Sequence, residues 1–328
     1  MLFRSNSNTF SEIRKLKWQN EQLFSFDWSP DGQHIAANFH TGSGDKIKIW
    51  NVTNGAIIYH IDVPIPGNSL AGNLDWHPEG NKLSMTTSDG YLLILDAVSG
   101  NELYRSEQKK NHFSRALWNS NGEYLVIGTE SGDLEVWRSD KDSVITFYKS
   151  IKAHKESIRD FDWDSEGNML VTCTRDSILK IWQNFPDLKL LRTMKRPHHT
   201  YPDYRSVDWS PNGEQIVTGG YEMIIWDVRN YLSPSDMKLE GHTDWVETVS
   251  WNSQSDLLAS GAGDKSIKIW NLQGREIKTL KGHEKWIESI AWGPADTILA
   301  TGSGDNDIII WDYETGTKIK TLESNTDN

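Results

Sequence analysis

The chain has 328 residues and a formal net charge of −12, from 34 Lys and Arg and 46 Asp and Glu. This acidic balance argues against a protein that binds duplex nucleic acid, which would need a basic face. The single cysteine, Cys173, excludes an internal disulfide framework and suits a reducing compartment. Because no apolar run is long enough for a signal peptide or a membrane span, the sequence predicts a cytoplasmic protein, and a nuclear one is also compatible.

A tryptophan ends the first predicted strand of each of seven repeats. These tryptophans follow one another along the chain at Trp28, Trp76, Trp118, Trp163, Trp209, Trp251 and Trp292. Several precede a tight-turn sequence, such as SPDG at 29–32 and SPNG at 210–213. Turn residues of this kind separate short strands, so each repeat is predicted to begin with a strand and a turn.

A second set of residues ends the third predicted strand of each repeat. The set consists of Trp50, Leu95, Trp137, Trp182, Trp226, Trp270 and Trp311. Successive members lie 41 to 45 residues apart. Strands that repeat at this period predict a propeller or a solenoid. Seven periods of four strands favour a closed ring, so we predict an all-β, seven-bladed propeller with four-stranded antiparallel blades.

The repeats resemble those of the WD40 family of the Gβ-like type over nearly the whole chain. The marks of that family are a Gly-His before the first strand, a Ser or Thr ending the second, an Asp in the next turn and the closing Trp. Blades four, six and seven carry all four side chains: His154, Thr172, Asp176 and Trp182; His242, Ser260, Asp264 and Trp270; and His283, Thr301, Asp305 and Trp311. The resemblance implies that each set forms a hydrogen-bonded tetrad with a structural role. A buried polar network is tolerated only when its members are satisfied.

The other four blades depart from this pattern. Blade one has an enlarged turn at 38–45, and blade two has Met85 and Leu95 where the hydroxyl residue and the Trp belong. Blade three has Ser131 at the position of the turn aspartate, and blade five is shortened by two residues at 219–226. We expect these blades to depend on apolar packing against their neighbours.

Two segments compete for the outermost strand of blade seven. Residues 12–28 align without a gap on residues 276–292, which predicts an outermost strand at 12–17, and the C-terminal run 317–322 resembles one too. WD40 rings usually close with an N-terminal strand, so we favour 12–17 for the fourth strand, with 317–322 as a fifth strand or loosely attached. The propeller is then predicted to span 11–323, between flexible ends at 1–10 and 324–328.

No motif in the sequence indicates catalysis. There is no nucleophile elbow, phosphate-binding loop or metal-spaced cluster of Cys and His. His198 and His199 are adjacent in a loop, which suits neither helix-face nor strand-face metal ligation. We therefore expect no enzyme activity and no cofactor, and we predict a binding platform instead.

The first strands indicate where a partner binds. Apolar residues lie five and two positions before the first-strand Trp, as at Val246 and Val249, which breaks the two-residue alternation of a strand. A bulge between them would restore it and turn the residues four and six positions before the Trp toward the top mouth of the channel, on the face of the Gly-His loops. The resemblance implies that such positions, and the residue before the turn Asp, grip partners. The candidates are Trp245, Trp286, Glu247, Glu288, Arg159, Arg175 and Arg205, with Lys195 and Arg196 in a long loop.

These candidates divide into a cationic group on blades four and five and an aromatic-acidic group on blades six and seven. The leading hypothesis is a scaffold or adaptor, monomeric within a larger complex, that binds a protein or peptide segment on the top face across blades four to seven. One alternative is binding of phosphorylated peptide or nucleic acid at the basic patch of blades four and five. Another is a ligand sensor or enzyme that uses the channel mouth. Fold alone cannot choose among them, because propellers host many functions.

Overall fold

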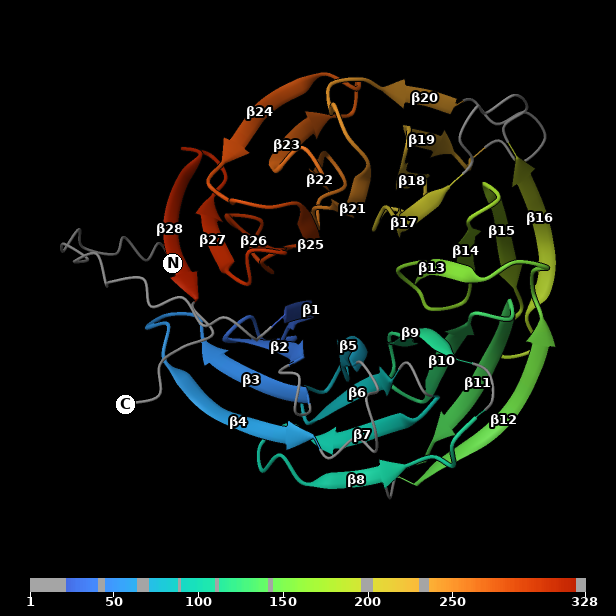
Figure 1. Cartoon of the computed structure of the whole chain (residues 1–328). Helices are drawn as coiled ribbons and strands as arrows, with labels where there is room; N and C mark the ends of the chain where they lie inside the picture. Colours follow the sequence, from blue (N-terminus) through green and yellow to red (C-terminus); the bar gives the residue numbers. More distant parts are fainter. Residues whose placement is uncertain are drawn as a thin grey trace.

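A computed structural model describes residues 22–40, 45–63, 71–87, 90–109, 112–140, 144–195, 203–229 and 236–322. These residues form seven four-stranded sheets, with strands paired in antiparallel order. The sheets stand as blades around a common centre (Figure 1), so the prediction of an all-β, seven-bladed propeller is confirmed. Within the described ranges, no helix is long and apolar enough to cross a membrane.

Each blade consists of four consecutive strands. Blade one contains β1 (Gln22–Trp28), β2 (His34–His40), β3 (Asp45–Asn51) and β4 (Ile57–Val63). Blade two contains β5 (Ala71–Trp76), β6 (Lys82–Thr87), β7 (Leu92–Asp96) and β8 (Glu102–Arg105). Blade three contains β9 (Phe113–Trp118), β10 (Tyr124–Thr129), β11 (Asp133–Ser139) and β12 (Ile145–Lys152). Blade four contains β13 (Ile158–Trp163), β14 (Leu170–Thr174), β15 (Ile178–Gln183) and β16 (Lys189–Lys195).

The remaining three blades follow the same order. Blade five contains β17 (Tyr204–Trp209), β18 (Gln215–Gly220), β19 (Met223–Asp227) and β20 (Asp236–Leu239). Blade six contains β21 (Val246–Trp251), β22 (Leu257–Ala262), β23 (Ser266–Asn271) and β24 (Glu276–Lys281). Blade seven contains β25 (Ile287–Trp292), β26 (Ile298–Ser303), β27 (Ile308–Asp312) and β28 (Thr317–Leu322). In Figure 1 the first strand of each blade lies nearest the centre and the fourth lies outside.

The apolar core lies between neighbouring blades. Inner strands are covered on both faces, and all five residues of β14 are buried. One apolar cluster joins Val171 and Ile181 of blade four to Trp209 and Ile216 of blade five. The seven first-strand tryptophans are at most 9% exposed. A repeat too small to bury its own faces is therefore stabilised by the repeats on either side.

The first strands contain the predicted bulge. In six blades the strand register shifts by one residue at the position four before the first-strand Trp, and this position is occupied by Phe24, Ser114, Arg159, Arg205, Glu247 and Glu288. In blade two the irregularity spans Ala71 to Leu74. The bulge restores the inward direction of the apolar residues on either side, since each extra residue reverses the alternation of the strand. The six residues at this position are called the bulge residues below.

The fourth strand of blade seven is the C-terminal run. β28 pairs with β27, which corrects the expectation that residues 12–17 take this place while 317–322 forms a fifth strand or attaches loosely. The two strands are joined by a short turn, in which the Gly316 N–H donates to the Asp312 carbonyl over 2.9 Å. A short connection closes with little loss of loop entropy, so this pairing forms locally.

Ring closure also uses the end of β28. Leu322 is buried and belongs to an apolar cluster with Trp28 and Ile35 of blade one. The last strand of the described chain therefore packs against the first blade. The predicted N-terminal strand 12–17 and the predicted flexible ends at 1–10 and 324–328 lie outside the described residues.

Candidate functional site

Blade six contains a complete tetrad. His242 donates from Nδ1 to Asp264 over 2.9 Å. The Ser260 hydroxyl lies 2.8 Å from His242 Nε2, to which it donates, and it accepts from the Trp270 indole N–H over 2.8 Å. The chain of bonds connects the loop before the first strand, the second strand, the turn and the third strand.

Blade seven repeats this arrangement with a threonine at its centre. His283 Nδ1 lies 3.0 Å from Asp305 Oδ2, and the Thr301 hydroxyl lies 2.8 Å from His283 Nε2. The Trp311 indole N–H donates to the same hydroxyl over 2.8 Å. Every polar atom in this buried chain therefore has a partner, as a structural role requires.

The charges in these tetrads are fixed by their surroundings. Burial lowers the pKa of the His242 imidazole and favours its neutral form. Burial alone would raise the pKa of Asp264, but hydrogen bonds from Ser266, the Thr243 amide and His242 lower it to about 2. Asp305 has a pKa of about 2 for the same reason, with His283 as the main donor against burial. In blade six, burial thus favours a neutral His242 imidazole beside an ionised Asp264 carboxylate, which fits a structural role.

Blade four has a shortened version of the tetrad. The Thr172 hydroxyl lies 2.7 Å from His154 Nε2 and accepts from the Trp182 indole over 3.0 Å. Asp176 accepts a hydrogen bond from Thr174 instead, and it acts on His154 only through its charge. Burial lowers the pKa of His154 to about 4. The expected hydrogen bond between His154 and Asp176 is therefore absent, and the Asp176 carboxylate accepts from the Thr174 hydroxyl in its place.

A second set of aspartates links neighbouring blades. In blades one, two, four and five, the residue before the first-strand Trp is Asp27, Asp75, Asp162 and Asp208, respectively. Each carboxylate accepts a hydrogen bond of 2.6 to 2.9 Å from the backbone N–H of the next blade's first-strand Trp. This inter-blade aspartate set was not predicted from the sequence, although the Asp-Trp dipeptide that marks it occurs four times at first-strand ends.

The bulge residues surround one central cavity. It has a volume of about 340 Å³, and its lining includes all six bulge residues and four other acidic or basic residues of the same first strands, Asp27, Arg115, Asp160 and Asp208. Arg115 forms an ion pair with Asp160. Among the described residues, four buried atoms at this cavity have no protein partner: Ser114 Oγ, Arg115 Nε, Glu288 Oε2 and Ser289 Oγ. The bulge residues of different blades thus line one shared space, which also contains buried polar groups.

Arg205 joins the two groups of candidate residues. Its guanidinium forms an ion pair with Glu247 and lies over the Trp245 ring, 4.4 Å from the ring centroid. It also lies 3.5 Å from Asp203. The expected separation of a cationic group from an aromatic-acidic group therefore does not hold between blades five and six, because opposite charges on adjacent blades pair across the boundary.

Trp286 and Glu288 form a second contact at the mouth. The Trp286 indole N–H donates to Glu288 over 2.8 Å, and the Trp286 side chain remains 45% exposed. Burial raises the pKa of Glu288 to about 7, with Glu247 adding to the shift. Trp245 is half-buried beneath Arg205. Trp286 is therefore the more accessible of the two candidate aromatic anchors.

The remaining candidates lie on blade four. Arg159 and Arg175 are exposed, and Arg175 Nε lies 4.0 Å from Asp203. Lys195 is exposed at the end of β16. Arg196, His198 and His199 lie outside the described residues. Within the described ranges, no three His, Cys, Asp or Glu side chains are grouped to hold a metal ion.

Comparisons with known proteins match this repeat structure. The family described as WD domain, G-beta repeat matches residues 10–51, 145–183 and 188–227, and the Anaphase-promoting complex subunit 4 WD40 domain matches residues 249–328. THO complex subunit 3 of Arabidopsis thaliana is 32% identical, over 77% of this chain and 76% of that protein. Eukaryotic translation initiation factor 3 subunit I of Caenorhabditis briggsae is 26% identical, over 76% of this chain and 83% of that protein. Both are named as subunits of larger assemblies.

Proposed function

The chain belongs to the WD40 repeat family, and on this premise we propose that it is a non-enzymatic scaffold or adaptor that binds a protein segment on its top face across blades four to seven. In this proposal it acts as a single propeller within a larger complex in the cytoplasm or nucleus. The names of its relatives support a role within an assembly. The location of the binding surface rests on the residues at the channel mouth.

The convergence of the bulge residues on one cavity carries this proposal. An extended segment laid across the mouth would meet Arg159 on blade four, the Arg205–Glu247 pair, and then Glu288 on blade seven. Trp286 stands beside this path with nearly half of its surface exposed. Exposed aromatic residues next to polar groups are typical of the residues that dominate binding energy.

The two tryptophans differ in how much ring surface a partner can contact. Arg205 already covers one face of Trp245, so a partner gains less by contacting that ring. Trp286 offers more accessible area and an indole N–H already held by Glu288. We therefore expect Trp286→Ala to weaken binding more than Trp245→Ala, and the double variant to lose at least about tenfold in affinity, or about 1.4 kcal/mol.

Partner capture followed by titration tests this proposal. The intact chain and the Trp245→Ala/Trp286→Ala variant are used to capture partners from the cell extract, and the identified partner is then titrated against each. The matched control is Ile277→Ala/Ile319→Ala, which removes two apolar side chains of 48% and 46% exposure from the outermost strands of the same blades. If the double variant binds like the parent and the control, the top face of blades four to seven is not the site.

A phosphorylated segment is the second candidate occupant, because Arg159 is exposed and also lines the cavity. Arginine can hold a phosphate or carboxylate through two parallel hydrogen bonds. Arg159→Glu should then weaken binding mostly at low salt, whereas the loss caused by Trp286→Ala should persist at high salt. Dephosphorylation of the captured partner separates the two cases, since only a phosphorylated segment would lose affinity.

A further inference from the structure

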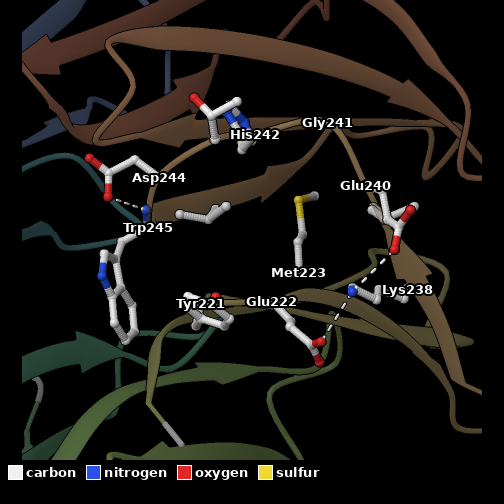
Figure 2. Close-up of a pocket in the computed structure, with 12 residues that line it drawn as sticks. Tyr221, Glu222, Met223, Lys238, Glu240, Gly241, His242, Asp244 and Trp245 are labelled. Atoms are coloured by element: carbon white, nitrogen blue, oxygen red, sulfur yellow. Dashed lines mark hydrogen bonds and ion pairs between the residues drawn. The ribbon is translucent and has the colours of Figure 1, made fainter. Parts of the chain in front are cut away.

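A second cavity lies between blades five and six, outside the central one (Figure 2). It has a volume of about 350 Å³ and lies between the β18–β19 turn and the chain that runs from β20 into β21. The β18–β19 turn contains only Tyr221 and Glu222, whereas the matching turn of blade six contains residues 263–265. We call this cavity the five–six groove; its lining residues are 221–223 and 238–246.

The floor of the five–six groove is apolar. Met223, Leu239 and Val246 contribute to it, and each is at most 5% exposed. Two aromatic rings form one wall, where Tyr221 contacts Trp245 edge to face with 5.4 Å between ring centroids. Tyr221 is 54% exposed. The groove therefore offers an exposed aromatic wall beside a floor of buried apolar side chains.

The rim of the groove is acidic. Glu222, Glu240 and Asp244 surround it, and the Lys238 ammonium lies 3.1 Å from both glutamates. Asp244 accepts the Trp245 backbone N–H over 2.8 Å, and the Glu240 side chain is 77% exposed. In Figure 2 Lys238 bridges the glutamates on one side of Met223, and Asp244 and Trp245 lie on the other. Three carboxylates share one cation, so the rim keeps a negative charge.

We propose that the five–six groove binds a partner segment in which an apolar side chain stands next to a lysine or arginine. The apolar side chain would cover Met223 beside Tyr221, and the cation would meet Asp244 or Glu240. This inference rests on the proposed function in that the occupant is a protein segment, but it uses a surface other than the bulge residues.

Charge and size select this occupant. An acidic segment would bring further negative charge to a rim that already has an excess of it, and like charges at an interface disfavour a partner. The volume is at the lower end of the range for ligand sites, so the groove accommodates one or two side chains rather than a folded domain. Apolar anchoring with a polar rim is the usual division of roles in a binding site.

Selection from a random peptide library tests the chemistry. Twelve-residue displayed peptides are selected on the immobilised full chain, and in parallel on a Glu240→Lys/Asp244→Lys variant. The matched control is Glu123→Lys/Glu130→Lys, which makes the same charge change at exposed positions of blade three. We expect peptides with an apolar residue beside Lys or Arg to be enriched on the parent and the control but not on the groove variant. Enrichment of acidic peptides, the same enrichment on all three proteins, or none on the parent would overturn the proposal.

Titration of the enriched peptide separates this proposal from the proposed function. Fluorescence anisotropy should show at least a tenfold loss of affinity for the groove variant and about a fivefold loss for Tyr221→Ala. Trp286→Ala should stay within twofold of the parent, because Trp286 belongs to the central mouth. If Trp286→Ala weakens the peptide and the groove variant does not, the peptide binds the central mouth; the groove proposal then fails while the proposed function stands.

Discussion

Blades six and seven hold their strands together differently from blades one, two, four and five. In blades six and seven a complete tetrad ties each blade to itself through His242 or His283. In the other four, one aspartate before the first-strand Trp reaches the backbone of the next blade. No blade has both the complete tetrad and the inter-blade aspartate, because blades six and seven have Ser250 and Ala291 at that aspartate position. The tetrad needs four matched side chains, whereas the inter-blade bond needs only one.

The pKa values of the two sets of aspartates are shifted in opposite directions. Asp264 receives bonds from side chains and amides, and its pKa falls to about 2 in spite of burial. Asp27 receives backbone N–H bonds from Trp76 and Trp28, but burial outweighs them and raises its pKa to about 6. Burial raises the pKa of an aspartate and hydrogen bonds to its carboxylate lower it, so the balance between the two decides the direction of the pKa shift.

Removing the last strand should have the largest effect on this comparison. Blade seven has a tetrad, but its fourth strand covers Ile308 and Ile310 with Leu322. Deleting residues 317–328 should cost roughly 3–5 kcal/mol through lost apolar burial, and thermal unfolding measures the loss. We expect a larger fall in melting temperature than deletion of residues 1–18 causes, because the fourth strand of blade seven is β28 and not the run 12–17 that the sequence favoured. The opposite order would mean that the N-terminal run contributes more to stability than β28 does.

Substituting the hydroxyl at the centre of a tetrad should have the next largest effect. The Thr301 hydroxyl joins two buried side chains, His283 and Trp311, whereas in the described part of the chain the Thr218 hydroxyl of blade five has one such partner, the Trp226 indole at 3.1 Å. Each stranded buried group costs ~1–3 kcal/mol, so Thr301→Val should destabilise by roughly twice as much as Thr218→Val. Urea denaturation of the two variants measures this. Equal losses of stability in the two variants would show that the bond between Thr301 and His283 adds nothing to the bond between Thr301 and Trp311.

Blade two should open before blade six. Blade two has Leu95 in place of the third-strand Trp, and its Thr86 hydroxyl is buried without a partner among the described residues. Blade six has the full tetrad around Ser260. Native-state hydrogen exchange should therefore be faster in β6 and β7 than in β22 and β23, because the weaker blade opens at lower free energy. Slower exchange in blade two would contradict a stabilising role for the tetrad.

The sequence predicts those features that a local residue pattern indicates. The tryptophan spacing predicts seven blades, and the spacing of Val246 and Val249 predicts the bulge that the structure contains at Glu247. It does not predict ring closure, because residues 12–17 and 317–322 match the same pattern and only pairing with β27 distinguishes them.

Contacts between blades are harder to predict than strands. The Arg205–Glu247 pair joins residues 42 positions apart, and each alone has the pattern of a solvated side chain. The five–six groove lies at the short β18–β19 turn. The sequence shows that this turn is short, but it does not show that the chain from β20 into β21 leaves a cavity beside it. The inter-blade aspartates were readable in principle from the repeated Asp-Trp, but their function depends on the adjacent backbone.

The pH dependence of stability should distinguish the two aspartate sets, and we expect the smallest effects here. Asp27 and Asp162 have a folded pKa of about 6 against an ordinary value of 3.8, so the folded chain binds their protons more tightly than the unfolded chain does. Their contribution is therefore fully present below about pH 4 and is lost as the pH rises toward 6. Asp264 and Asp305, with a pKa of about 2, contribute above pH 4 and lose that contribution as the pH falls toward 2.

Replacing one aspartate of each set by asparagine should flatten the dependence of stability on pH on only one side of about pH 4. Asp27→Asn keeps an oxygen that can accept the Trp76 N–H, so it should flatten the decline in urea midpoint between pH 4 and 6 and leave the acid side unchanged. Asp264→Asn should flatten the loss of stability below pH 4, because the ionised acceptor of His242 is gone. Glu130→Gln, at an exposed position of blade three, controls for the change in net charge. If both aspartate variants alter the same limb of the profile, burial and hydrogen bonding do not separate the two sets, since each set would then titrate in the same range.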